Sequence, residues 1–210
     1  MRTLLAYTAT PRVVPDLRRT LSVQREYYPK AWAAYDKVVV GGWMDDLPCV
    51  SVDCGEGDDF CISKARNAAI GYAYREGYDW VVLLDADHVV LNGAERMPRS
   101  GFGAPLTAWQ WEHEGFPLDL SAEARWMESQ WWILGREHFG RKFCEQFVGY
   151  GFEEVDFQRH VMADVPVTET DLRVVHLWHP RRATRWADVQ LFDQRKREYE
   201  EKRSGNTEKV

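Results

Sequence analysis

The chain has 210 residues, 45% of them hydrophobic, and a formal net charge of −6. This length favours a single domain, and the hydrophobic content is enough for a core and too high for a disordered chain. The net negative charge argues against a broadly basic surface that binds nucleic acid, although a local basic patch stays open.

Hydrophobic patterns in the first half of the chain predict alternating strands and helices. In order, these are a strand at 4–9, a helix at 14–28, strands at 37–40 and 49–52, a helix at 63–75 and a strand at 80–84. We expect Ser63 to cap the second helix and Gly77 to follow its end. The run at 80–84 is wholly apolar, which is typical of a strand buried on both faces of a sheet. The order predicts an α/β domain with a Rossmann-like, mixed and mostly parallel central sheet flanked by helices.

The second half of the chain is less regular. Residues 93–123 contain many glycines and prolines and are predicted to form loops. A strand at 131–134, helices at 136–147 and 153–162, and a last strand at 173–176 are predicted next. Residues 181–210 mix basic and acidic side chains, which favours a charged helical tail with a solvated face. We therefore expect one domain at 1–180 and a tail at 181–210.

Cysteine spacing and the N-terminal residues indicate where the protein resides. None of the four cysteines forms a C-x-x-C pair, so we expect reduced thiols. Residues 1–10 lack the apolar core of a signal peptide, and no apolar stretch approaches the length of a membrane span. A cytoplasmic protein without a membrane span is expected.

Two acidic residues directly follow the apolar strand at 80–84. Asp85 and Asp87 are separated by one residue, and ligands of open α/β sheets bind beyond the carboxyl ends of the strands. Paired carboxylates suit a hard divalent cation, which can stabilise the charge of a departing nucleotide diphosphate. D-x-D also occurs by chance as a turn cap. The apolar strand before it makes a metal site the better interpretation here. Neither G-x-G-x-x-G nor a P-loop is present, so phosphates would be held by other means.

Two later segments carry further candidate groups. His176 and His179 follow the last predicted strand, and imidazole is a suitable ligand for manganese-like ions. A glycine-rich turn at 149–152 leads into Glu153, Glu154 and Asp156 at a helix start. Acids stabilise helix N-termini in any protein, but a carboxylate held near an acceptor hydroxyl can also act as a general base.

Together these motifs resemble the GT-A glycosyltransferase superfamily. They are the Arg66–Asn67 pair, the D-x-D motif at 85–87, the G-x-G…E-E-x-D box at 149–156 and the late histidine. The resemblance runs from residue 3 to residue 180 and is nearest to the family-two enzymes. The β-1,4-galactosyltransferases and the polypeptide N-acetylgalactosaminyltransferases share the later motifs. It implies a GT-A fold and a metal-dependent hexosyltransferase that takes its sugar from a nucleotide diphosphate, with a UDP-sugar the first expectation.

The resemblance also implies roles for individual residues. The residues that would bind the nucleotide sugar are Thr8, Pro11, Arg12, Asp53, Arg66, Asp85 and His179. The ligands of the cation, Mn²⁺ or Mg²⁺, would be Asp85, Asp87 and His176. Whether His179 is also a metal ligand stays open. The catalytic group is Glu154 as base with Asp156 beside it. Candidates for acceptor binding are Glu153 and two tryptophans of a region rich in aromatic residues, Trp109 and Trp111.

The chain departs from the family pattern in two ways. Its base position is Glu154 where Asp is commoner, and the chain is short, so we expect no separate acceptor domain within it. The hypothesis is inverting transfer in a bacterial or viral enzyme. The acceptor stays open between a glycan, a protein side chain, a small metabolite and a hydroxymethylated DNA base. The alternatives are a nucleotidyltransferase acting on sugar phosphates and a non-catalytic nucleotide-sugar-binding protein.

Overall fold

The structure is a computed structural model that describes residues 1–10, 13–55, 60–92, 101–110, 132–148, 152–177 and 189–205. In chain order its elements are β1 (Thr3–Thr8), α1 (Val14–Tyr27), α2 (Pro29–Ala34), β2 (Asp36–Val40), β3 (Cys49–Val50), α3 (Ile62–Arg75), β4 (Trp80–Asp85), β5 (His88–Val90), β6 (Phe102–Gln110), β7 (Trp132–Gly135), the 3₁₀ turn η3 (Arg136–His138), α4 (Glu153–Asp156), the π-helical turn η4 (Phe157–Val161), β8 (Val167–Leu177) and α5 (Val189–Gly205).

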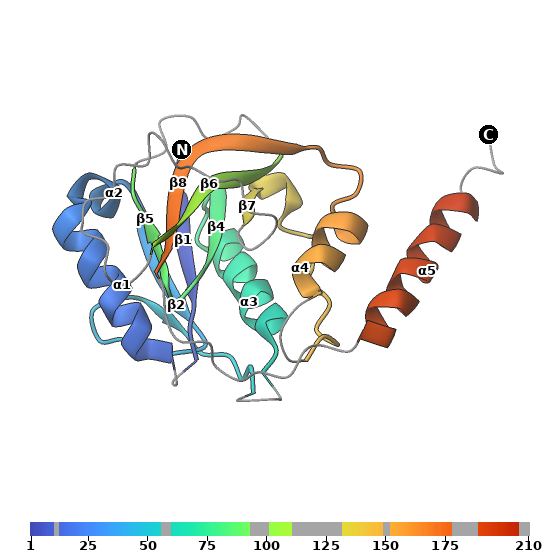
Figure 1. Cartoon of the computed structure of the whole chain (residues 1–210), viewed down its shortest axis with the longest axis horizontal. Helices are drawn as coiled ribbons and strands as arrows, with labels where there is room; N and C mark the ends of the chain where they lie inside the picture. Colours follow the sequence, from blue (N-terminus) through green and yellow to red (C-terminus); the bar gives the residue numbers. More distant parts are fainter. Residues whose placement is uncertain are drawn as a thin grey trace.

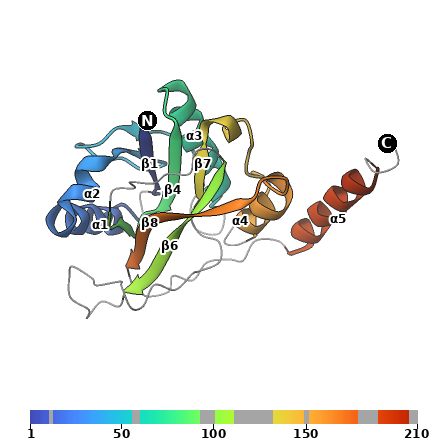
Figure 2. The ribbon, with the colours of Figure 1, turned by 90° about the horizontal axis from the view of Figure 1, so that it is seen from above.

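The described strands form one sheet in the order β3-β2-β1-β4-β7-β6-β8-β5. β3, β2, β1 and β4 run parallel to one another, and β6 runs parallel to β8 beside it (Figure 2). β7 is antiparallel to both β4 and β6, and β5 is antiparallel to β8. The mixed, mostly parallel sheet predicted from the sequence is therefore confirmed.

Helices cover both faces of this sheet, with α1 and α2 on one face and α3 and α4 on the other (Figure 1). Because side chains alternate along a strand, β1 contributes to two cores. Leu5 packs in the core that contains Leu17 of α1, whereas Leu4 packs in the core that contains Ile70 of α3. Among the described helices, none has both the length and the apolar character needed to cross a bilayer.

The elements predicted in the first half are confirmed, with shifted ends. α3 begins at Ile62 with Cys61 as its N-cap and no side-chain cap bond, so the prediction that Ser63 is the cap is wrong. The predicted helix at 14–28 ends at Tyr27, and Pro29 then begins the short helix α2. This agrees with the preference of proline for the first turn of a helix.

The predicted helix at 136–147 is wrong. After η3 the chain is irregular, because the side chain of Asn67 binds both backbone groups of Phe143. Asn67 Nδ2 donates to the Phe143 carbonyl at 3.0 Å, and Asn67 Oδ1 accepts the Phe143 N–H at 2.9 Å. Asn67 Nδ2 also donates to Glu145 Oε1 at 2.8 Å. The side chain of Asn67 in α3 thus forms the hydrogen bonds that the Phe143 N–H and carbonyl would form within a helix. Tertiary contacts therefore override the local sequence pattern.

The prediction of loops throughout 93–123 is wrong for residues 102–110, which form β6. Pro105 argues against a strand at this point of the sequence, because proline has no backbone N–H to donate to a neighbouring strand. The register between β6 and β8 shifts between Ala104 and Leu106, so Pro105 lies at a bulge where no ladder bond is required.

Candidate active site

Thr8 and Asp85 lie side by side at the carboxyl edge of the parallel strands. β1 and β4 are neighbours, and their register pairs Thr8 with Asp85. The Thr8 side chain is buried, and the side chain of Asp85 is 29% exposed. Ligands of open α/β sheets bind at this edge, so the first acid of the D-x-D motif lies where a ligand can meet it.

A buried arginine joins this edge to the acids of α4. Arg66 is only 2% exposed, and its Nη2 donates to Glu154 Oε1 at 2.6 Å. The same nitrogen lies 3.5 Å from Asp85 Oδ1, and Nη1 lies 3.7 Å from Glu153 Oε1. The Arg66 guanidinium also lies over the ring of Phe143, 5.4 Å from its centroid. One guanidinium therefore balances three carboxylates from two distant parts of the chain.

Burial and charge act against each other in this cluster. Burial raises the pKa of Asp85 to about 6, although the Arg66 charge lowers it. Burial also raises the pKa of Glu154, and the nearby charges of Glu153 and Asp85 add to that effect while Arg66 opposes it. Burial by itself would lower the pKa of Arg66, but the three carboxylates raise it further above its ordinary value. A carboxylate with a raised pKa is a stronger base than an exposed one.

A second cluster lies where β5 pairs with β8. The antiparallel register places His88 opposite His176, and their ring centroids are 5.2 Å apart. His176 Nε2 lies 3.4 Å from Asp87 Oδ2, and His88 Nε2 lies 3.4 Å from Asp87 Oδ1. Among the described residues, the group of close metal-ligand atoms contains Asp87, His88 and His176. Asp85 is not part of that group.

His88 is suited to orient Asp87 rather than to bind a cation. Its Nδ1 accepts the backbone N–H of Asp85 at 2.8 Å. A ring nitrogen that accepts carries no proton, so the neutral ring carries its proton on Nε2, the atom that faces Asp87. That proton occupies the lone-pair position a cation would need. Histidine and carboxylate pairs of this kind fix the direction of metal ligands.

Asp87 and His176 remain as metal ligands with suitable spacing. Two ligand atoms that bind one ion at right angles, each about 2.1 Å from it, are about 3 Å apart. The 3.4 Å between Asp87 Oδ2 and His176 Nε2 is close to that separation. A carboxylate oxygen with an imidazole nitrogen suits manganese-like ions. The described residues thus suit the cation that the sequence predicts. Of the two acids in the D-x-D motif, Asp85 lies beside Arg66 and Asp87 lies beside His176.

The acids of the later motif lie in a short turn with an unusual start. α4 spans Glu153–Asp156 and follows Phe152, which has a φ of 68° in the left-handed region. Glu153 is 2% exposed and lies against Arg66. Asp156 is wholly buried and is bound by Arg195 of α5. Glu154 therefore faces the Arg66 cluster, whereas the contacts of Asp156 lead toward α5.

Other predicted residues are placed apart or are not described. Asp53 is exposed beyond β3 and accepts the N–H of Gly55 at 3.0 Å. The predictions for Pro11, Arg12, Trp111 and His179 lie outside the described residues, as does the side chain of Trp109. The backbone of residue 109 pairs in register with that of His176. The roles assigned to these residues stay predictions.

Two residues of the site were not predicted. His88 follows the D-x-D motif directly, so its position next to the acids was a usable signal. Arg195 lies among alternating charges that predict a solvated helix face, and nothing in that pattern distinguishes it. Its partnership with Asp156 is visible only in three dimensions.

Solved structures with a similar fold include a galactosyltransferase and TarS. A Drosophila β-1,4-galactosyltransferase 7 in complex with manganese, UDP-Gal and xylobiose matches with a TM-score of 0.51 and 17% identity, over 80% of this chain and 65% of that chain. A shortened S. aureus TarS in complex with UDP-GlcNAc matches with a TM-score of 0.55 and 13% identity, over 87% of this chain and 60% of that chain. The chain has a GT-A fold.

The GT-A likeness is one of structure and not of sequence. A longer TarS structure matches with a TM-score of 0.56 and 14% identity, over 86% of this chain and 37% of that chain. The chain thus spans less than two thirds of the length of these structures. Neither a protein-family model nor a curated protein matches its sequence.

Proposed function

We propose that the chain is a metal-dependent glycosyltransferase. It transfers a hexose from a nucleotide diphosphate sugar, a UDP-sugar first among the candidates, to an acceptor hydroxyl with inversion at the anomeric carbon. One observation carries the proposal. Residues from four separate parts of the chain meet at one edge of the sheet, as Arg66 with Asp85 and Glu154, and Asp87 with His176.

The cation is assigned to Asp87 and His176, with His88 orienting the carboxylate. A bound divalent cation would offset the negative charge that a diphosphate gains as it leaves. Support for this donor class comes from two structural neighbours, one bound to manganese and UDP-Gal and the other to UDP-GlcNAc.

The proton transfer is assigned to Glu154. Its carboxylate takes the proton of the acceptor hydroxyl, and the acceptor oxygen forms a bond to the anomeric carbon. The bond between that carbon and the diphosphate oxygen breaks, and the nucleoside diphosphate leaves with the electron pair. Arg66 holds Glu154 Oε1 at 2.6 Å and so fixes the direction of the base. Because the Glu154 side chain is only 14% exposed, its carboxylate is poorly solvated and more basic than a fully exposed one.

Ligand binding is tested first, with a thermal-shift panel of nucleotide sugars measured with and without Mn²⁺. A ligand that binds only the folded state raises the melting temperature, and the shift grows with the logarithm of the ratio of ligand concentration to Kd. We expect a shift with one donor class that requires Mn²⁺. Release of a nucleoside diphosphate in the presence of an acceptor supports transfer, whereas release of pyrophosphate would identify a nucleotidyltransferase.

The base assignment is tested with Glu154→Gln. This change keeps the size of the side chain and removes its ability to accept a proton. We expect donor affinity to stay nearly unchanged and kcat to fall roughly a hundredfold or more. Glu26→Gln, an exposed change on α1, is the matched control and keeps full activity. Full turnover by the Glu154 variant would remove Glu154 from the mechanism. The anomeric configuration of the product, read by NMR, tests inversion separately.

A further inference from the structure

The C-terminal helix α5 is joined to a buried acid of α4. Asp156 is 0% exposed, and both of its carboxylate oxygens accept hydrogen bonds from Arg195. Arg195 Nε donates to Oδ1 at 2.7 Å, and Nη2 donates to Oδ2 at 2.9 Å. His160 Nδ1 lies 2.8 Å from Asp156 Oδ1. A two-pronged bond between guanidinium and carboxylate is among the strong hydrogen-bond geometries, and here it compensates a charge that burial would otherwise make costly.

Arg195 lies on the face of α5 that is turned toward α4. Leu191 and Arg195 are one helical turn apart and are both partly buried, whereas Lys196 and Arg197 are exposed. Arg197 Nε donates to the carbonyl of Asp193 within α5. In Figures 1 and 2, α5 lies beside α4 and away from the sheet. Arg195 therefore does not belong to the solvated face that the sequence predicts for this tail.

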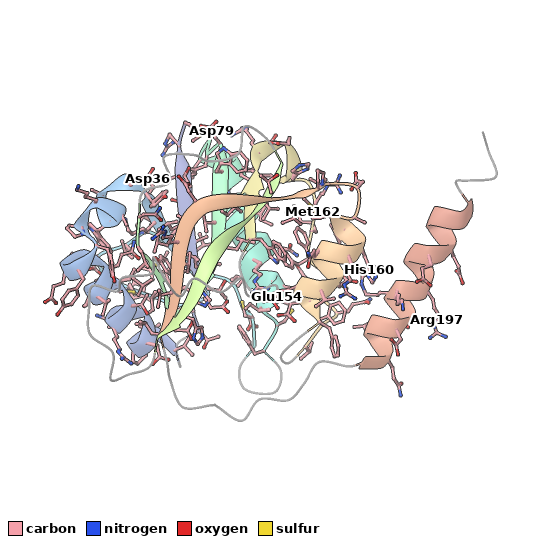
Figure 3. All side chains as sticks on the ribbon, turned by 45° about the horizontal axis from the view of Figure 1, so that its top comes forward. Asp36, Asp79, Glu154, His160, Met162 and Arg197 are labelled. Atoms are coloured by element: carbon pink, nitrogen blue, oxygen red, sulfur yellow. The ribbon has the colours of Figure 1, made fainter. Side chains whose placement is uncertain are left out.

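Asp156 belongs to the same short turn as Glu154. α4 continues directly into η4, and a helical segment that spans only 153–161 is too short to be stable on its own. The left-handed backbone of Phe152 at its start is also costly for a residue with a side chain. Contacts with the rest of the protein must therefore set the direction of this turn. Arg66 holds Glu154 from α3, and Arg195 holds Asp156 from α5. In Figure 3, Glu154 lies toward the sheet, whereas His160 lies toward α5.

We infer that Arg195 is a positioning residue for the base. The Arg195–Asp156 pair fixes the α4 turn from one side, so that Glu154 keeps the direction in which it meets the acceptor hydroxyl. Asp156 then acts through the backbone of α4 rather than on the substrate, and α5 is part of the catalytic unit. The inference rests on the proposed function, because it concerns the base of that reaction.

The kinetic test compares Arg195→Met, Arg195→Lys and Arg197→Met. Activity is expressed per donor-binding site, measured by titration with the nucleotide sugar, so that misfolded protein is not counted. We expect Arg195→Met to lower kcat by roughly 10- to 100-fold, since small misplacements of catalytic groups have effects of this size, while KM for the donor stays nearly unchanged. Arg195→Lys should recover part of kcat, because an ammonium restores the charge but not the two-pronged geometry. Arg197→Met, on the exposed face of the same helix, should behave as wild type.

Hydrogen exchange gives a readout that does not depend on activity. Amides of residues 152–162 should exchange faster in Arg195→Met than in wild type, while those of β4 stay protected in both. Equal exchange at 152–162 in the two proteins would overturn the inference. So would a loss of activity that merely follows the loss of donor-binding sites, since that marks a structural role alone. A wild-type chain that transfers no sugar would instead defeat the proposed function, and that result is distinct from an active wild type whose Arg195→Met variant is equally active.

Discussion

Replacing Arg66 with methionine removes the one guanidinium that faces three carboxylates. Methionine keeps much of the length and apolar volume of the side chain, so the change acts mainly through charge. The three partners are Glu154, Asp85 and Glu153, with atom separations of 2.6, 3.5 and 3.7 Å. Their side chains are 14%, 29% and 3% exposed, so water can compensate for the loss only in part. Removing one partner from a buried ion pair costs about 3–5 kcal/mol, and we expect a loss in that range at pH 8.

The loss should depend on pH in a defined direction. Burial raises the pKa of Asp85 from an ordinary 3.8 to about 6, and the charge of Arg66 is the largest influence that lowers it. In both proteins the folded state binds a proton at Asp85 more readily than the unfolded chain, so both lose free energy of unfolding as the pH rises from about 4 to 6. Without Arg66 the pKa of Asp85 rises further, so the variant continues to lose free energy of unfolding above pH 6, where the wild type does not. The gap between wild type and variant is expected to be small at pH 5 and largest at pH 8.

The assay is urea unfolding at pH 5, 6, 7 and 8 with EDTA present, so that bound cations do not contribute. Arg25→Met is the matched control, because Arg25 pairs with Asp46 at 3.4 Å on the surface, where both side chains are more than half exposed. That control should lose less than about 1 kcal/mol at every pH. An Arg66 variant with the same loss at pH 5 and pH 8 would show that the guanidinium does not balance the three acids.

Further variants test the second cluster and the sheet. His88→Phe removes both ring nitrogens, so Asp87 loses its orienting partner; we expect the affinity for Mn²⁺, measured by calorimetry, to fall about tenfold or more. An unchanged affinity would leave His88 with a packing role. Gly103→Ala would bring a Cβ within 2.9 Å of Thr170 Cγ2 and 3.3 Å of the Thr168 carbonyl oxygen. This crowding should cost about 1–3 kcal/mol in urea unfolding. Gly140→Ala is the control, since nothing lies within 4 Å of its added Cβ, and equal stability of the two variants would contradict the crowding argument.

Much of the fold followed from hydrophobic periodicity, because the parallel strands are buried and continuous. The run Trp80–Leu84 gave β4, and the acids after it gave the binding edge, since strand polarity fixes which end they occupy. The elements that were missed depend on tertiary structure. β6 is concealed by Pro105 at its bulge, and the absence of a helix after η3 follows from the bonds of Asn67 to Phe143.

The site was predictable as a set of residues but not as an arrangement. The sequence indicated Arg66, Asp87, Glu154 and His176 as site residues. It could not show that the guanidinium of Arg66 would contact three carboxylates. It also could not show that the two acids of the D-x-D motif have different partners. The folded backbone after β4 sets that division, because it places Asp85 3.5 Å from Arg66 and Asp87 3.4 Å from His176.

The pairing of β5 with β8 has a consequence for how the molecule assembles. Asp87 precedes β5, whereas His176 belongs to β8, the last strand among the described residues. The two donors become neighbours once that strand has closed the sheet, and contacts between such distant segments form slowly. Under the proposed function, uptake of a cation by this pair would therefore require that β5 and β8 have paired. An ion bound there would hold the late strand in place, and chelation should loosen that edge before the rest of the protein.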